Sequence, residues 1–333
     1  MMTDHAIRRF ELTLPIGELL PGEQFEIGMR VIAPATGAPQ TNIALYCLPG
    51  GQTNLSYFDL GEGDDRRFSL AEALARRGHV VITADHPAIG RSTAPRDEYA
   101  LTPDLLASAH VLASGRAVER LRAGTLAEGL EAIPNATVLG CGHSMGAVMM
   151  IEVQSRAAPF AGLALLGYGS GGLPALLPPE VVEASRDPEW ARTGLPDFVR
   201  SRFGTALQSP EAARASKRGK EKGSPSFNTD NADPDGRMAL RGASAPLLTM
   251  PGIYSMFPGV SDRASAQIKV PVLVVTGTHD FVTAGEELRQ QFASSREVRI
   301  FNPEGAGHNL FIFPSRTESF ATISDWADEF APS

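Results

Sequence analysis

The sequence predicts an α/β fold in which helices cover both faces of a mostly parallel sheet, with one long insertion. From residue 43 onward, short apolar runs alternate with segments of helical length. The runs are apolar at nearly consecutive positions, which is typical of strands buried on both faces. This alternation favours parallel strands joined by right-handed helical crossovers.

An antiparallel hairpin is expected before these strands. Residues 10–14 and 25–32 alternate apolar and polar side chains, and the pair Pro21-Gly22 between them is a turn signal. Because such alternation indicates one exposed face, both segments are predicted as edge strands.

The buried strands and the helices then follow in turn. The predicted strands are 43–48, 79–84, 137–141, 163–166, 270–276 and 297–301, and the predicted helices are 68–77, 102–122, 145–156, 283–292 and 315–330. The alternation stops between about residues 169 and 269, a stretch too long for an ordinary connection. The sequence therefore predicts a core formed by residues 1–169 and 269–333, interrupted by an insertion at 170–268.

The insertion has a polar middle and apolar flanks. Residues 216–237 are rich in Lys, Gly, Ser, Asn, Asp and Pro, which predicts a mobile loop. The flanks carry aromatic and aliphatic residues that could cover a cleft at the strand ends, so a cap or lid is expected. An insertion remote from the site is the alternative.

Composition and charge exclude several kinds of partner and compartment. The formal charge is −8 at pH 7 and no dense basic stripe is present, so nucleic acid is not an expected partner. No apolar run approaches the ~20 residues that span a bilayer, and the N-terminal residues lack a signal-peptide core. Cys47 and Cys141 lie inside apolar runs, which indicates buried reduced thiols. A cytoplasmic protein is therefore expected.

The stretch Gly142-His143-Ser144-Met145-Gly146 places a serine between a predicted strand and a predicted helix. A tight strand-to-helix turn needs glycines where a Cβ atom would clash, and it exposes the serine hydroxyl. The serine also lies at a helix N-terminus, which favours developing negative charge. Ser144 is the predicted nucleophile.

A serine nucleophile needs a base and an acid that orients the base. Asp280 follows the strand 270–276, and His308 lies in a Gly-rich loop after the strand 297–301. These are the predicted acid and base. For Asp280 the alternative is a helix N-cap, and Asp262 is the weaker candidate for the acid. His279 is the weaker candidate for the base, because adjacent residues of an extended segment point in opposite directions.

These features together resemble the α/β-hydrolase superfamily, in which the order nucleophile, acid, histidine matches Ser144, Asp280 and His308. The loop Leu48-Pro49-Gly50-Gly51 is similar to the family's His-Gly stretch, with proline in place of histidine. The loop 85–92 is similar to the pattern D-x-x-G-x-G-x-S, with Ala88 in place of the first glycine. The resemblance implies an eight-stranded sheet with a cap and a catalytic triad.

The resemblance also implies further roles at the site. The backbone N–H groups of Met145 and Gly51, with Gln52 in reserve, are the expected oxyanion hole, although the glycines could simply form a tight turn. His143 and His86 are possible substrate contacts, with a packing role as the alternative. No zinc-type cluster and no nucleotide-binding glycine motif is found, so no metal or cofactor is expected.

In the family's strand order the strands that carry Cys47 and Cys141 are neighbours. We expect the two thiols to lie close together and to stay reduced, because adjacent parallel strands rarely offer disulfide geometry.

The predicted function is hydrolysis of a carboxylic ester, lactone or thioester through an acyl-enzyme on Ser144. The apolar flanks of the insertion favour a medium or bulky, partly hydrophobic small-molecule acyl substrate. The same triad also serves C–C bond hydrolases, amidases and acyltransferases. A hydrolase-like protein that binds a small molecule without catalysis is a further alternative.

Overall fold

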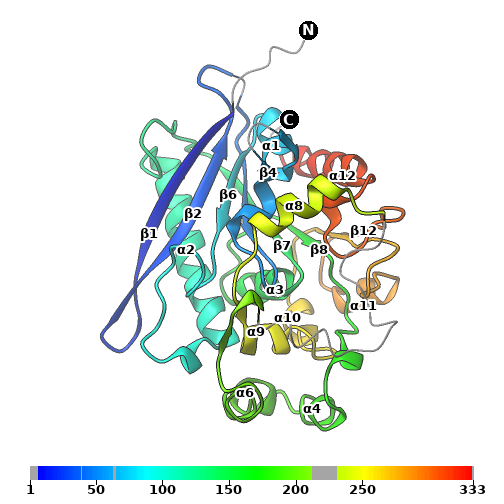
Figure 1. The fold of residues 1–333 in the computed structure, drawn as a ribbon. Coiled ribbons are helices and arrows are strands. Elements are labelled where there is room, and N and C mark those ends of the chain that lie inside the picture. Colours follow the sequence, from blue (N-terminus) through cyan, green and yellow to red (C-terminus); the bar gives the residue numbers. More distant parts are fainter. Residues whose placement is uncertain (1–6, 39, 63–64, 212–230, 332–333) are drawn as a thin grey trace.

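An eight-stranded sheet forms the centre of the molecule. In a computed structural model, which describes residues 7–38, 40–62, 65–211 and 231–331, the strand order is β1-β2-β6-β3-β7-β8-β11-β12 (Figure 1). The last six strands of this order run parallel to one another, and β2 is antiparallel to both of its neighbours, β1 and β6. The mostly parallel sheet predicted from the sequence is confirmed.

The strands of this sheet agree with the predicted runs to within a few residues, except that the N-terminal hairpin is longer. Their bounds are β1 (Arg8–Leu20), β2 (Glu23–Ala33), β3 (Ile43–Leu48), β6 (Val80–Ala84), β7 (Thr137–His143), β8 (Leu163–Leu166), β11 (Val272–Val275) and β12 (Val298–Phe301). Of the two hairpin strands, only β1 lies at the edge. The prediction of two edge strands is wrong for β2, because β2 also pairs with β6.

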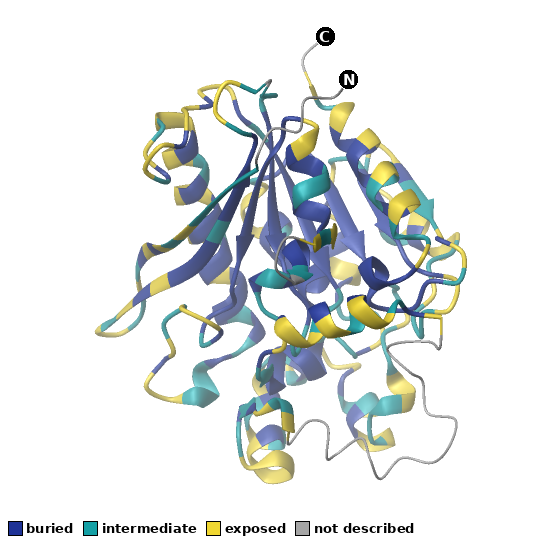
Figure 2. Ribbon diagram, turned by 45° about the horizontal axis from the view of Figure 1, so that its top comes forward, coloured by how far each residue is buried: buried dark blue, intermediate teal, exposed yellow. Residues whose placement is uncertain are grey.

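Helices cover both faces of the sheet, as predicted (Figure 2). The helices of the core are α1 (Leu70–Arg76), α2 (Pro103–Ala123), α3 (Met145–Ala157), α11 (Glu287–Gln291) and α12 (Arg316–Asp328). Local signals set the bounds of α2. The Thr102 side chain accepts the N–H of Leu105, Pro103 occupies the first turn, and Gly124 ends the helix at φ 71°.

The core has two layers, one on each face of the sheet. Along β3, Ala44, Tyr46 and Leu48 pack into the layer that contains α2 and α3. The alternate residues Ile43, Leu45 and Cys47 pack into the layer that contains α1 and α12. Because both faces are covered, the strand is apolar at every position.

The two cysteines lie on adjacent strands of this sheet. Cys47 on β3 is directly opposite Cys141 on β7, and both thiols are free and buried. Burial, together with a hydrogen bond to Cys141, raises the pKa of Cys47 well above its usual value. The predicted proximity of the two residues is confirmed.

The described residues of the 170–268 segment, 170–211 and 231–268, fold into short elements rather than into another strand of the main sheet. These elements are η3 (Pro174–Leu176), α4 (Pro179–Ala184), α5 (Trp190–Thr193), α6 (Leu195–Phe203), β9 (Leu207–Gln208), α8 (Pro234–Gly242), β10 (Leu247–Leu248), α9 (Thr249–Tyr254) and α10 (Asp262–Ser265). In Figure 1, α4 and α6 lie below α9 and α10. The strands β9 and β10 pair with each other and bring the two halves of the segment together.

A buried carboxylate attaches this segment to the core. Glu152 on α3 accepts hydrogen bonds from the Tyr254 hydroxyl at 3.0 Å and from Arg192 at 3.2 Å. Arg156 pairs with the same carboxylate at 3.2 Å. Since Arg192 lies on α5 and Tyr254 on α9, one side chain of α3 holds two elements of the insertion.

Two predicted elements differ from the structure. Residues 216–230 of the expected mobile loop lie outside the described residues. Its last residues, 234–237, form the first turn of α8. Asp233 caps that turn by accepting the N–H groups of Asp235 and Gly236, and Pro234 suits the first helical position. The helix expected at 283–292 is shorter and consists only of α11; just before it, the Glu287 side chain accepts the Gly285 N–H at 3.1 Å.

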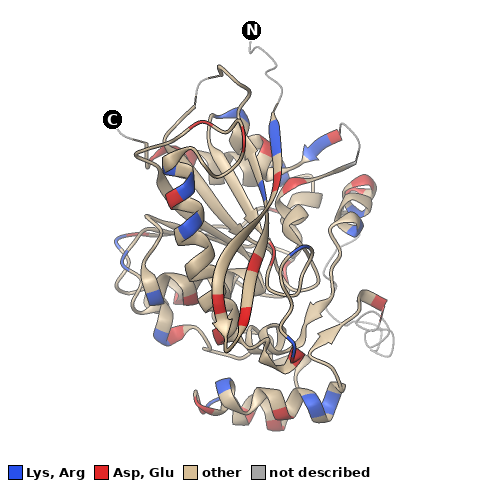
Figure 3. Cartoon of the chain, turned by 90° about the vertical axis from the view of Figure 1, so that its left-hand side faces the viewer, with Lys and Arg blue, Asp and Glu red and all other residues tan. Residues whose placement is uncertain are grey.

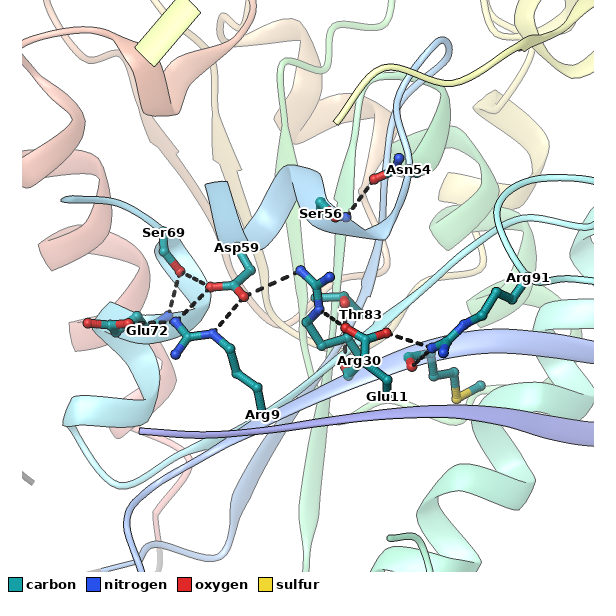
Figure 4. Close-up of polar contacts among 11 residues, drawn as sticks. Arg9, Glu11, Arg30, Asn54, Ser56, Asp59, Ser69, Glu72, Thr83 and Arg91 are labelled. Carbon is teal, nitrogen blue, oxygen red and sulfur yellow. Dashed lines mark hydrogen bonds and ion pairs between the residues drawn. The ribbon is translucent and has the colours of Figure 1, made fainter. Parts of the chain in front are cut away.

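A buried aspartate joins the N-terminal hairpin to the segment that follows β3 (Figure 4). Asp59 ends the 3₁₀-helix η1 (Leu55–Asp59) and precedes the hairpin of β4 (Leu60–Glu62) and β5 (Asp65–Phe68). Its carboxylate, only 3% exposed, accepts hydrogen bonds from Arg9 at 2.9 and 3.0 Å, from Ser69 at 2.7 Å and from Arg30 at 3.4 Å. Burial alone would raise the pKa of Asp59, but the hydrogen bonds and the two positive charges outweigh it and lower the pKa.

The Asp59→Asn variant is therefore expected to lose about 2–4 kcal/mol of unfolding free energy at pH 7, because it leaves the arginines without their buried anion. Since the folded-state pKa is depressed, this stabilisation is present above the unfolded pKa of about 4 and is lost as the pH falls through the folded value. Urea unfolding at pH 7 and pH 3 measures the difference. The exposed pair partner Glu183, changed to Gln, is the control and should cost less than about 1 kcal/mol. Equal losses in the two variants would contradict the account.

Acidic and basic residues are interspersed on the face that carries β1 and β2 (Figure 3). Within the described ranges, none of the helices has the length and apolar character needed to cross a membrane.

Candidate active site

Ser144 occupies a strained position between β7 and α3. Its backbone has φ 54° and ψ −121°, a conformation that residues with a Cβ atom rarely adopt. A Cβ atom on Gly142 would lie 2.4 Å from the Gly146 carbonyl oxygen, and one on Gly146 would lie 2.3 Å from the Leu48 carbonyl oxygen. Both glycines are therefore required by close backbone contacts in this turn.

The hydroxyl of Ser144 begins a chain of three hydrogen-bonded side chains. Ser144 Oγ lies 2.8 Å from His308 Nε2. On the other side of the ring, His308 Nδ1 lies 3.0 Å from each carboxylate oxygen of Asp280. A carboxylate only accepts, so Nδ1–H donates to Asp280 and the Nε2 lone pair accepts the serine O–H. The Asp280 side chain is fully buried.

The parallel strands bring these residues together although they lie far apart in the chain. Ser144 follows β7, Asp280 follows β11 and His308 follows β12. All three therefore lie at the carboxyl ends of the parallel strands. The loops of Asp280 and His308 also touch. A Cβ atom on Gly277 would lie 2.1 Å from the Ala306 carbonyl oxygen, which accepts the His279 N–H at 2.9 Å.

The two weaker candidates lie outside this chain of contacts. His279 is exposed. Asp262, on α10, accepts a hydrogen bond from Gln291 at 2.7 Å.

His143 lines the cavity but is only 3% exposed, and its polar contact is with the protein. Its Nε2–H donates to the His308 carbonyl oxygen at 3.0 Å, and its ring stacks on Tyr57 with 4.2 Å between the centroids. Burial, and then the nearby charge of His308, lower its pKa well below the usual value. The neutral ring therefore fixes the backbone of His308, which favours the packing alternative over direct substrate contact.

Tyr57 and Phe281 are neighbours of the triad that the sequence did not reveal. Phe281 packs on the His308 ring with a centroid distance of 4.2 Å, and its position next to Asp280 was the available signal. Tyr57 lies behind His143, where burial and the charge of Asp280 raise its pKa well above 10.

His86 does not line the cavity, so the structure corrects its expected role as a substrate contact. It is 1% exposed and belongs to a buried chain of side chains. Its Nε2 lies 3.0 Å from the Pro49 carbonyl oxygen, its Nδ1 lies 2.9 Å from His110 Nε2, and His110 Nδ1 lies 3.0 Å from the Tyr46 hydroxyl.

The direction of each hydrogen bond in this chain is fixed because the chain ends at the Pro49 carbonyl oxygen, which can only accept. Burial lowers the pKa of His86 to about 4 and lowers the pKa of His110 well below its usual value, so both rings are neutral. His86 Nε2–H donates to Pro49, His110 Nε2–H donates to His86, and the Tyr46 O–H donates to His110. The chain thus holds the peptide that precedes Gly50 from within the core.

The Tyr46→Phe variant is expected to lose about 1–2 kcal/mol of unfolding free energy, because the buried His110 Nδ1 loses its donor. Urea denaturation of the variant against the parent protein measures this loss. Tyr99→Phe is the matched control, since the Tyr99 side chain is partly exposed and packs against Arg200. A Tyr46→Phe variant as stable as the control would contradict the donor assignment.

The turn after β3 faces Ser144 and carries one of the two expected oxyanion donors, while Met145 carries the other. Gly51, Gln52 and Met145 all line the cavity. A Cβ atom on Gly50 would lie 2.8 Å from His143 Nδ1, so this turn packs closely on the strand-to-helix turn that carries Ser144. Gln52 has φ 66°, which shows how tight the turn is. The N–H of Met145 lies in the first turn of α3, where no helical carbonyl can accept it.

A cavity of about 440 Å³ lies over Ser144. The core contributes Val148, Tyr168 and Phe281 to its wall. The 170–268 segment also contributes apolar residues to the wall, namely Leu173, Leu240, Leu247 and Met256. The volume is within the usual range for small-molecule sites. Within the described parts of the chain, no group of three or more His, Cys, Asp or Glu side chains could hold a metal ion.

Comparison with known proteins supports the fold and the family. Residues 45–322 match the model of a family described as the alpha/beta hydrolase family. No curated protein matches the chain.

Several solved structures share the fold over nearly the full length. The thioesterase domain from the curacin biosynthetic pathway is 16% identical, with a TM-score of 0.56 over 97% of this chain and 99% of that one. A bromoperoxidase from Bacillus anthracis is 16% identical, with a TM-score of 0.57 over 96% and 100%. An esterase from Thermogutta terrifontis is 16% identical, with a TM-score of 0.52 over 96% and 98%. At this identity the likeness concerns the fold alone.

Proposed function

The chain belongs to the alpha/beta hydrolase family, and we propose that it is a serine hydrolase that cleaves a carboxylic ester, thioester or lactone. One observation carries this proposal. Ser144, His308 and Asp280 form a continuous hydrogen-bonded chain whose serine lines a cavity of about 440 Å³. A serine hydroxyl in this arrangement has a base to take its proton and an acid to orient that base.

The reaction follows from the direction of these hydrogen bonds. His308 Nε2 takes the proton as Ser144 Oγ attacks the acyl carbon, and the buried Asp280 carboxylate stabilises the resulting imidazolium. His308 then gives the proton to the leaving oxygen or sulfur, whose bond to the acyl carbon breaks. A water molecule, deprotonated by the same imidazole, then attacks the acyl-enzyme. The imidazolium returns this proton to Ser144 Oγ as the bond between Oγ and the acyl carbon breaks, which releases the acid and restores the free enzyme.

The tetrahedral intermediate carries an oxyanion that needs fixed donors. We assign this role to the backbone N–H groups of Met145 and Gly51, with Gln52 as the alternative to Gly51. Their shared position on the cavity wall supports the assignment. The buried chain from Tyr46 to the Pro49 carbonyl would keep the turn in place during the reaction.

Residues 170–268 are proposed to act as a cap over the site. Leu173, Leu240, Leu247 and Met256 of this segment line the cavity, and Glu152 holds the segment on α3. A wall of this kind suits a medium-sized, partly hydrophobic acyl group.

Hydrolysis of a graded substrate panel tests the proposal. 4-Nitrophenyl esters of increasing acyl length, an aliphatic thioester, a lactone and an anilide are compared by kcat/KM, with enzyme-free blanks. We expect ester turnover with an optimum at medium acyl length, because the cavity is apolar but limited in volume. Failure to hydrolyse any ester, thioester or lactone, or a preference for the anilide, would overturn the proposed reaction.

A further inference from the structure

The charged side chains that line the cavity are all of one sign within the described residues. They are Arg237 and Arg241, and neither Asp nor Glu joins them there. Both arginines belong to α8 and are four residues apart, so they lie on the same face of that helix. The chain as a whole has a charge of −8, so a positive wall is a local feature of this site.

The acidic residues of α8 are engaged away from the cavity. Arg67 on β5 pairs with Asp235 at 2.5 Å and lies 3.7 Å from Asp233, which also caps the helix. Arg241 is exposed, and its side chain makes neither a hydrogen bond nor an ion pair with the described residues. Its charge is therefore available to a ligand in the cavity.

Backbone contacts fix the end of α8 relative to the nucleophile. The Asn54 N–H donates to the Ala243 carbonyl at 3.0 Å, and the Ala245 N–H donates to the Gln52 carbonyl at 2.9 Å. Between these two bonds, Thr53 and Ser244 form a β-bridge. The segment that follows Arg241 is thus attached to the turn that carries the proposed oxyanion donor, so the guanidinium is placed on a wall beside the reacting centre.

We propose that the site selects acyl substrates that carry a carboxylate away from the scissile carbonyl, and that Arg241 binds this carboxylate. A guanidinium binds a carboxylate through two parallel hydrogen bonds, and a partly enclosed cavity strengthens the attraction. Arg237 lies on the same helix face and also lines the cavity. Leu240 and Leu247 provide apolar contacts for the carbon chain between the two functional groups. This inference rests on the proposed hydrolase activity and names its substrate class.

A matched pair of esters tests the inference. Mono-4-nitrophenyl adipate carries a free carboxylate, whereas methyl 4-nitrophenyl adipate is its neutral counterpart. We expect the parent enzyme to prefer the acid by about tenfold in kcat/KM. Arg241→Gln should reduce this preference about tenfold, mainly through KM for the acid, and Arg241→Lys should keep part of it. The preference should also weaken as NaCl is raised, because exposed charges are screened.

Arg263→Gln is the control variant, since Arg263 is an exposed arginine on α10 that does not line the cavity. It should keep the parent's ratio of the two kcat/KM values. Equal kcat/KM for acid and neutral ester in the parent enzyme, or the same ratio in Arg241→Gln as in Arg263→Gln, would overturn the inference.

A binding measurement separates this inference from the proposed reaction. Monomethyl adipate and dimethyl adipate are titrated calorimetrically into the Ser144→Ala variant, in which turnover is expected to be too slow to disturb the titration. Tighter binding of the acid, lost on adding Arg241→Gln, would support the inference even if no ester were hydrolysed. Equal binding of the two ligands would overturn it while leaving ester hydrolysis standing.

Discussion

Ser144→Ala is expected to lower kcat/KM for the best ester about 10⁵-fold, the largest effect of any single substitution in this protein. The change removes the only atom of the site that forms a bond to the acyl carbon in the proposed reaction. The remaining backbone donors would still stabilise the oxyanion of a direct attack by water, so a small residual rate is expected. Steady-state kinetics on the preferred 4-nitrophenyl ester measures the loss. Retention of more than a tenth of the parent activity would refute the nucleophile.

A second variant at this position separates catalysis from folding. Ser144→Gly should be equally inactive but more stable than Ser144→Ala by about 1 kcal/mol, because glycine adopts φ 54° and ψ −121° without strain. Thermal or urea unfolding compares the two variants. If Ser144→Ala were the more stable variant, the backbone at residue 144 would not be strained as proposed.

Asp280→Asn is expected to lower kcat/KM about 10⁴-fold. The amide of asparagine can donate to His308 Nδ1, which would place the ring proton on Nε2. An Nε2 that carries a proton cannot accept the proton of the Ser144 hydroxyl. The imidazolium formed during the reaction would also lose its buried counter-charge, which now lies 3.0 Å away. The loss should appear mainly in kcat, measured on the same ester.

Asp262→Asn is the control for this variant. Asp262 accepts a hydrogen bond from Gln291, near the end of α11, and does not line the cavity. Its activity should stay within about twofold of the parent. A large loss in Asp262→Asn with a small one in Asp280→Asn would exchange the two assignments.

The elements that the sequence predicted well are those whose signals are local. Strands such as β3 are apolar at each position because both faces are covered, and α2 carries its cap residues Thr102 and Gly124 at its ends. Ser144 could be found because Gly142 is required by a backbone contact with Gly146, only four residues away, and because β7 and α3 flank Ser144 directly. His308 and Asp280 could be placed because each follows a strand of one parallel sheet.

Other features depend on partners far away in the chain, which no local pattern reveals. The sequence placed His86 in a loop near the site. Its hydrogen bonds with His110, on α2, and with the Pro49 carbonyl oxygen instead hold its ring in the core. The start of α8 was not predicted, because the polar composition of 216–237 indicated a loop although Asp233 and Pro234 are typical residues of a helix N-terminus.

The position of Arg241 on the cavity wall could not be predicted either. It depends on how the insertion folds back against the turn after β3, through the backbone bonds of Ala243 and Ala245. The aromatic stacking of Tyr57 beneath His143 is equally non-local.

Covalent labelling tests the central claim most directly. The parent protein is treated with a fluorophosphonate ester, which modifies serines activated by a neighbouring base, and the adduct is located by peptide mass spectrometry. We predict a single stoichiometric adduct on the peptide that contains Ser144, and labelling at least about a hundredfold slower in His308→Asn, because the general base contributes on that order. No adduct, an adduct on another serine, or unchanged labelling in His308→Asn would contradict the claim that His308 activates Ser144.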